Sequence, residues 1–173
     1  MAFEKNCAEC HGTYGDAWTY PERVVPLAEI GTDPARLQAL PPAAKAHYGE
    51  TWFNHFGATP VDESSTGYVA PPLDGIWASA PYFHNGSVPT LEHLFHPNER
   101  PVVWRRSQDG YDTARVGLEV EAFDEVPEEA KTAAERRHYF DTRQRGKSAA
   151  GHLFPERLTA EEKRAVIEYL KTL

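Results

Sequence analysis

The sequence is poor in methionine, because Met1 is the only one among its 173 residues. It has two cysteines, Cys7 and Cys10, which share one motif and leave none for a structural disulfide. No stretch approaches the roughly 20 apolar residues of a membrane-spanning helix. Acidic residues outnumber basic ones, 26 to 18, and the net charge of −8 disfavours nucleic acid and anionic membrane surfaces as partners.

Proline and glycine are frequent, with 14 and 12 residues, and only 40% of the chain is hydrophobic. This composition predicts many loops and a core completed by an embedded cofactor. The length is typical of one domain spanning residues 1–173. No leader peptide precedes Cys7, so we expect a processed protein or a domain excised from a longer one.

The stretch Cys7-Ala8-Glu9-Cys10-His11 has the C-x-x-C-H pattern of c-type haem attachment. Two thiols three residues apart on a helical turn reach the two vinyl groups along one porphyrin edge. The next residue, His11, then lies under the iron as an axial ligand. A redox dithiol and half of a zinc site are the alternatives. The first lacks a βαβ context, and the second lacks a further pair of ligands.

The second axial position is the sharper question, because Met1 lies too close to His11 in sequence to reach the opposite face. Histidine is then the leading ligand type, ahead of lysine, tyrosine, water or an open position. The candidates are His47, His55, His84, His93, His96, His138 and His152.

His152 is the preferred candidate. It precedes Tyr169 of a C-terminal helix by 17 residues, a spacing similar to that between ligand and helix aromatic in mitochondrial-type cytochrome c. Gly146 and Gly151 allow the loop before it to turn tightly. His84, within the rigid aromatic turn "APYFHNGSVP", is the competitor, and its other interpretation is a hydrogen-bonding residue beside the haem.

Several helices are predicted. One spans residues 3–11, a second starts near Thr32 or Asp33, and a third is "TLEHLF" with Thr90 as its cap. The clearest is C-terminal, where Thr159 and Glu162 form a capping box before an apolar face. Residues 98–145 are interpreted as a surface insertion whose segment "VPEEAKTAAERRHYFDTRQR" forms a solvated helix. The aromatic run 47–57 is expected to cover an apolar surface.

The stretch "GYVAPPLDGIWASAPYFHNGSVPTL" (67–91) closely resembles the C-terminal haem domain of bacterial di-haem cytochrome c peroxidase-like proteins, especially the rubber-oxygenase-like branch. "VVPLAEIGTDPARL" (24–37), "RPVVW" to "YDTARVG" (100–117) and the C-terminal tail support this resemblance. It implies that His152 occupies the position of a methionine ligand, that His84 lies near the haem edge, and that the haem is bis-histidine. Those relatives carry two haem motifs and this chain has one, so it resembles their electron-transfer half.

The expected fold is therefore all-α and class I cytochrome c-like, with one covalent haem, long loops and a polar helical insertion. The expected function is electron transfer through a six-coordinate low-spin haem, without catalytic residues. The alternatives are a peroxidase- or oxygenase-like enzyme with an open or displaceable distal site, and a structural or gas-sensing haem module. No residue cluster compels a calcium site.

Other expectations concern the surroundings of the haem. Trp77 and Tyr82 are candidate haem-edge residues, although aromatic packing is the simpler interpretation. Arg100 is a candidate partner of a haem propionate. We expect a redox partner protein or a fused second haem domain as the partner. The expected location is the periplasm or the exterior of the cell, because haem c is attached in the periplasm.

Overall fold

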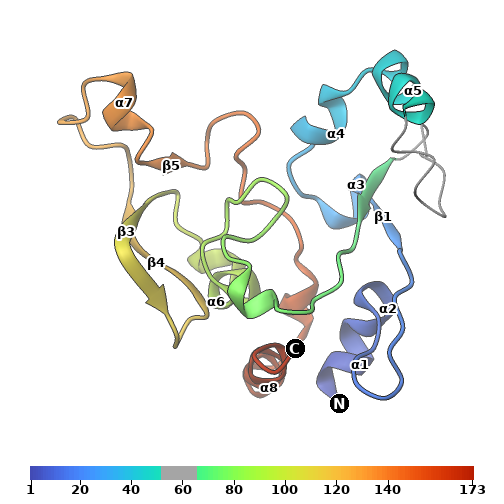
Figure 1. Ribbon diagram of the computed structural model, residues 1–173. Coiled ribbons are helices and arrows are strands. Elements are labelled where there is room, and N and C mark those ends of the chain that lie inside the picture. The colour runs from blue at the N-terminus through green and yellow to red at the C-terminus, as the bar shows by residue number, and fades with distance from the viewer. Residues whose placement is uncertain (52–65) are drawn as a thin grey trace.

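The backbone is described for residues 1–51 and 66–173 of a computed structural model, with no side-chain description at residues 48, 49 and 109. Most of the aromatic run 47–57 thus lies outside the described residues. The described part mixes short helices with two antiparallel sheets, so the all-α prediction is wrong. Figure 1 shows the larger sheet on one side, and α1 and α2 on the other side of the molecule.

The larger sheet has the strand order β4–β3–β5. Its strands are β3 (Val103–Asp112), β4 (Gly117–Phe123) and β5 (Phe140–Asp141). The smaller sheet pairs β1 (Val24–Pro26) with β2 (Gly67–Val69). Both sheets are antiparallel, and β3 and β4 are joined by the short connection 113–116.

The larger sheet explains why the all-α prediction failed. Its strands fall in the polar segment 98–145, where cross-strand pairing satisfies the backbone and few side chains need burial. Trp104 is buried there, as are Val103, Val116 and Leu118. Its indole N–H donates to the Ser87 carbonyl at 3.2 Å, and its ring stacks on Phe140. That the segment is an insertion stays a prediction.

The predicted polar helix in this segment is mostly absent. Only α7 (Ala133–Arg136) forms, started by a capping box in which Thr132 and Glu135 exchange hydrogen bonds. The rest of residues 126–145 is turns and the short β5. A segment charged on all sides has no apolar face to pack, so little tertiary stabilisation extends the helix.

The N- and C-terminal helices pack together beside the C-x-x-C-H motif and form part of the core. The N-terminal segment is helical as predicted, divided at Cys7 into α1 (Ala2–Asn6) and α2 (Ala8–His11). Phe3 of α1 is 2% exposed and its ring lies 5.0 Å from that of Tyr169 on the C-terminal helix. This contact fixes the motif against the last helix of the chain.

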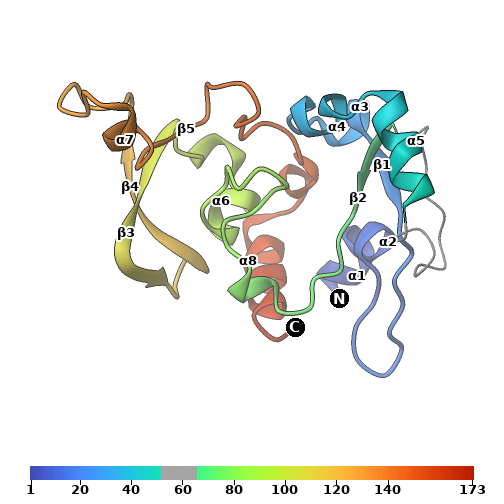
Figure 2. The same ribbon diagram turned by 45° about the horizontal axis from the view of Figure 1, so that its top comes forward.

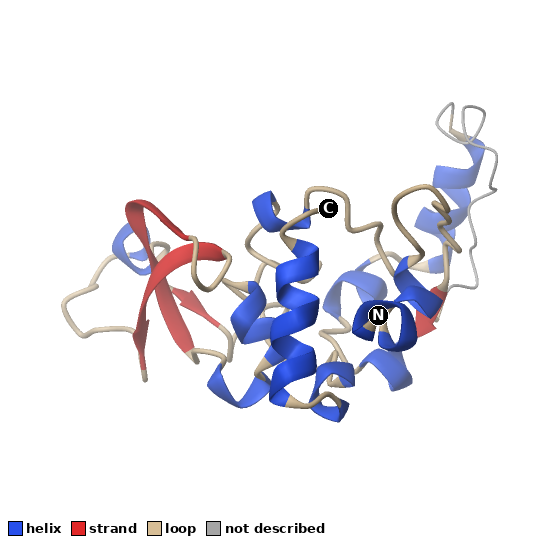
Figure 3. Ribbon diagram, turned by 90° about the horizontal axis from the view of Figure 1, so that it is seen from below, coloured by secondary structure: helices blue, strands red, loops and turns tan. Residues whose placement is uncertain are grey.

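The C-terminal helix α8 (Ala160–Leu170) matches its prediction. The Thr159 hydroxyl accepts the Glu162 N–H at 3.2 Å, and the Glu162 carboxylate accepts the Thr159 N–H at 2.9 Å. Val166, Ile167 and Leu170 face the core. Figure 3 shows α8 between the larger sheet and the N-terminal helices.

Three helices surround the smaller sheet: α3 (Leu27–Ile30), α4 (Ala35–Ala39) and α5 (Pro42–Glu50). The predicted helix start is confirmed, since the Asp33 carboxylate accepts the Ala35 N–H at 2.8 Å. Figure 2 shows these helices gathered around one end of the β1–β2 pair.

The helix α6 (Leu91–Phe95) is capped by Thr90 as predicted, whose hydroxyl accepts the His93 N–H at 3.1 Å. Leu91 and Phe95 belong to the main core. Short 3-10 turns complete the described elements: η2 (Ile76–Ala78), η3 (Pro97–Glu99) and η4 (Phe154–Arg157).

His93 makes α6 sensitive to acid. Burial, aided by the positive charge of Arg115, lowers the pKa of His93 to about 4. Its imidazole is 7% exposed and its Nδ1 lies 2.8 Å from the Thr90 hydroxyl. Because the unfolded chain takes up this proton first, near its ordinary pKa of about 6.5, acidification favours unfolding.

We therefore expect protonation linked to His93 to lower the free energy of unfolding by about 3 kcal/mol between pH 7 and pH 4, and this loss to be absent above pH 7. Urea unfolding at several pH values measures this cost. His93→Gln should make the pH dependence shallower, whereas His138→Gln, at an exposed histidine, should leave it unchanged. An equal pH dependence in wild type and His93→Gln would exclude this role.

Candidate haem site

The C-x-x-C-H motif lies on one continuous turn. Cys7 joins α1 to α2, its N–H donates to the Phe3 carbonyl at 2.8 Å, and its carbonyl accepts the N–H groups of Cys10 and His11. Both cysteines are free and partly buried. Burial raises the pKa of the Cys7 thiol to about 11, the opposite of an activated redox dithiol.

His11 is oriented by its backbone neighbour across the site. Its Nδ1 lies 2.9 Å from the Pro71 carbonyl oxygen, so Nδ1–H is the donor and Nε2 carries the free lone pair. A ligating histidine ordinarily has such a carbonyl partner on its other nitrogen. Burial lowers the pKa of His11, which keeps the imidazole neutral and able to bind a metal.

His152 comes to this site on the loop before η4. Its backbone has φ 52°, in the left-handed region, and follows Gly151 with φ 86°. The His152 N–H donates to the Ile30 carbonyl at the end of α3 at 2.6 Å. A histidine at positive φ is uncommon, so the surrounding contacts determine this conformation.

Residue Ser148 anchors the same loop to two other segments. Its N–H donates to the Asp33 carboxylate at 3.0 Å. Its carbonyl accepts the Asn85 side-chain N–H at 2.9 Å and the Ser87 hydroxyl at 3.0 Å. The aromatic turn of residues 82–88 and the loop before α4 therefore both hold the segment that carries His152.

The structure brings His11 and His152 together. Their ring centroids are 6.3 Å apart, with 61° between the ring planes. One metal ion bonded to a nitrogen of each ring, at about 2 Å, separates the two centroids by roughly 6 Å. The separation of the two rings is therefore compatible with both imidazoles ligating one metal ion.

Aromatic side chains surround His152, and one of its ring nitrogens lacks a hydrogen-bond partner in the described part of the chain. The rings of Phe83 and Phe154 lie 6.1 Å and 5.3 Å from the His152 ring. Among the described residues its Nδ1 has no hydrogen-bond partner, although that atom is buried. Burial, aided by His11 and Arg100, lowers the pKa of His152 to about 4. Cys7, Cys10, His11 and His152 thus fit a haem c.

His84 occupies a different place. Its ring stacks on Tyr68 with centroids 4.3 Å apart, and its carbonyl accepts a hydrogen bond from Arg36 at 3.4 Å. Its Nε2 is buried and has no partner in the described part of the chain. This geometry is compatible with the prediction that His84 serves beside the haem, which stays a prediction.

The other predicted haem neighbours differ in their environment. Tyr82 is 4% exposed and its hydroxyl donates to the carbonyls of Ile76 and Val116, which makes it a core residue. Trp77 is 45% exposed. Arg100 is partly buried and donates to four backbone carbonyls. Their roles toward the haem stay predictions.

Sequence reasoning missed the groups that hold the two histidines. The Pro71 carbonyl and the Asp33 carboxylate act across long sequence separations, and only their position in turn-rich segments hinted at them. Phe154, two residues after His152, was recognisable as an aromatic neighbour. Within the described ranges no group of three or more histidine, cysteine or acidic side chains could hold a metal ion, so the zinc alternative finds no ligand set there.

A c-type cytochrome site is thus the class that the motif and the histidine pair indicate. Comparison with known families agrees: residues 67–105 match the model of the RoxA-like, cytochrome c-like family. This confirms the resemblance to the rubber-oxygenase-like branch. The matched stretch runs from β2 through α6 into β3, contains His84 and Arg100, and lies between the cysteine motif and His152.

Two longer proteins of Sinorhizobium fredii (strain NBRC 101917 / NGR234) are similar to this chain. "Uncharacterized protein y4iM" is 35% identical over 140 residues, which cover 66% of this chain and 31% of that protein. "Uncharacterized protein y4iJ" is 40% identical over 116 residues, which cover 61% of this chain and 18% of that protein. The chain thus spans less than a third of the length of these relatives. No helix among the described residues is long and apolar enough to cross a membrane.

Proposed function

We propose that this chain transfers electrons through one haem c, attached to Cys7 and Cys10 and ligated by His11 and His152. The observation that carries the proposal is the 6.3 Å separation of the two imidazole rings, one of which directly follows the cysteine pair. The cytochrome c-like match at residues 67–105 supports the same cofactor independently of the motif.

When bound, a haem with two imidazole ligands supplies one-electron exchange and leaves no open position on the iron. The residues of this chain keep that arrangement rigid. The Pro71 carbonyl holds the His11 tautomer, and the Ile30 carbonyl fixes the His152 backbone. Phe83 and Phe154 exclude water beside His152. Little rearrangement then accompanies each change of oxidation state.

Two further features follow from this proposal. Histidine in place of methionine lowers the reduction potential, because a thioether stabilises the reduced iron better than an imidazole does. The net charge of −8 favours a basic docking face on the redox partner, with binding that weakens as salt increases.

The longer relatives leave room for a fused second haem domain as the electron donor or acceptor, and we propose this or a separate redox protein as the partner. We place the protein in the periplasm or outside the cell, since covalent haem attachment takes place there in bacteria.

The visible spectrum of the protein, produced with a cytochrome c maturation system, tests the proposal. We expect haem that remains bound after denaturation, low-spin spectra in the ferric and ferrous forms, and no change when CO is added. A high-spin ferric form or rapid CO binding would contradict electron transfer and favour an enzyme with an open distal position.

A further inference from the structure

Arg100 connects the loop that carries His152 to the helix α6. Its guanidinium donates to Ala149 O at 2.6 Å and to Gly151 O at 2.8 Å, both from one terminal nitrogen. The other two nitrogens donate to His93 O at 3.0 Å and to Leu94 O at 3.1 Å. One side chain therefore spans the last turn of α6 and the two residues on either side of Ala150.

This use of an arginine has a clear physical reason. Carbonyls at the end of a helix, such as those of His93 and Leu94, have no hydrogen-bond partner within the helix. The carbonyls of Ala149 and Gly151 lie in a loop, and Arg100 donates to them as well. The planar guanidinium offers five donors in a fixed arrangement, and four bonds are made here. A lysine has the charge but cannot reproduce this geometry.

The positive charge of Arg100 is not neutralised by a close ion pair. Among the described residues no carboxylate lies within 4.0 Å of its guanidinium, and Glu156 acts on it only from a longer distance. Burial lowers the pKa of Arg100 to about 10, so it stays charged at neutral pH.

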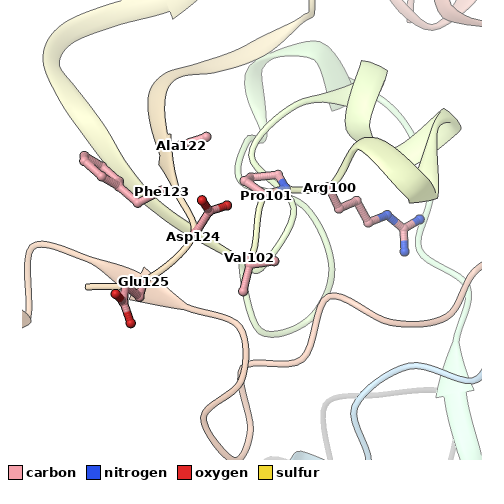
Figure 4. A pocket seen from close by; sticks show the side chains of 7 residues that line it. All are labelled: Arg100, Pro101, Val102, Ala122, Phe123, Asp124 and Glu125. Carbon is pink, nitrogen blue, oxygen red and sulfur yellow. The ribbon is translucent and has the colours of Figure 1, made fainter. Parts of the chain in front are cut away.

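The orientation of Arg100 brings that charge toward the histidine pair. Figure 4 shows that its side chain points away from Val102 and Phe123, which line the surface pocket beside it. Its guanidinium carbon lies 5.0 Å from the centre of the Phe83 ring, and that ring is 6.1 Å from His152. Phe83 thus neighbours both the Arg100 guanidinium and the His152 ring.

We propose that Arg100 is the positioning residue of the second axial ligand, and that its buried charge raises the reduction potential of the haem. This inference rests on the proposed haem function. The four carbonyl bonds hold the left-handed turn that presents His152. The charge favours the reduced iron, which carries one positive charge fewer than the oxidised iron.

Two substitutions separate the two roles. Arg100→Lys keeps the charge and loses the planar donor set, whereas Arg100→Gln loses both. Arg106→Gln is the matched control, because it removes the same charge from an exposed side chain in β3. The reduction potential of the haem, measured by redox titration, tests the effect of the Arg100 charge. The rate at which cyanide replaces the sixth ligand in the ferric protein tests how firmly His152 is positioned.

We expect Arg100→Gln to lower the equilibrium constant for haem reduction about tenfold, which is 59 mV for one electron. Arg100→Lys should stay close to wild type in potential. Both variants should bind cyanide about tenfold faster, and Arg106→Gln should match wild type in both measurements.

Two results would overturn the proposal. One is an Arg100→Gln protein with wild-type potential and cyanide rate. The other is equal potentials in Arg100→Gln and Arg100→Lys, which would leave no role for the charge. If Arg100→Gln yields no holoprotein, Arg100→Lys alone decides the positioning role through its cyanide rate. Failure of the bis-histidine proposal is recognised separately, by a high-spin spectrum of the wild-type protein.

Discussion

Replacing His152 with alanine should convert the ferric haem from low-spin to high-spin and open the iron to CO. The imidazole lies 6.3 Å from that of His11, centroid to centroid, and no methionine other than Met1 exists to replace it. The change should be complete, because an iron that loses one strong axial ligand keeps only His11 and a weak or absent sixth ligand. The visible spectra of both oxidation states, with and without CO, measure it.

His84→Ala is the matched control for that experiment. Its ring stacks on Tyr68 and belongs to the same turn-rich surroundings, so the substitution removes an imidazole of equal size from another place. We expect a low-spin spectrum indifferent to CO. A high-spin His84→Ala protein together with a low-spin His152→Ala protein would show that the second ligand had been assigned to the wrong histidine.

Gly151→Ala should release the loop that carries His152. Gly151 has φ 86°, and an added Cβ would overlap the backbone of Gly31 and Thr32, which cannot move away as a flexible side chain could. Backbone overlap and a left-handed conformation together should cost about 3 kcal/mol of unfolding free energy. Chemical denaturation of the holoprotein measures this cost, and a partly high-spin spectrum should accompany it.

Gly146→Ala is the control that separates the cost of a left-handed backbone from the cost of steric overlap with a neighbouring segment. Gly146 also has a left-handed backbone, with φ 81°, but its added Cβ would lie 3.6 Å from the Ala35 side chain, an ordinary contact. We expect a cost of about 1 kcal/mol and an unchanged low-spin spectrum. If the two glycine variants were equally destabilised and both stayed low-spin, the close approach of Gly151 to Gly31 would have no part in holding His152.

The elements that the sequence predicted well are those with local signals. The capping box at Thr159, the cap at Thr90 and the turn of Cys7 to His11 each depend on residues within a few positions of one another. Such features follow from backbone hydrogen bonding over one turn of chain.

The features that the sequence could not reveal depend on distant segments. The larger sheet pairs strands whose polar side chains give no strong periodic signal, and its anchor, Trp104 on Ser87, becomes visible only in three dimensions. The hold on the His152 loop comes from Ile30, Asp33, Asn85 and Arg100, each more than 45 residues away. The choice of His152 over His84 used chain position alone, and the structure adds its proximity to His11.

The position of the iron relative to the two imidazoles tests the central proposal most directly. An anomalous-difference map from crystals of the holoprotein, measured at the iron absorption edge, locates the metal without assumptions about its ligands. We predict one peak between His11 and His152, within bonding distance of a nitrogen of each. A peak bonded to His11 with His84 or a water molecule on its other side would contradict bis-histidine ligation through His152.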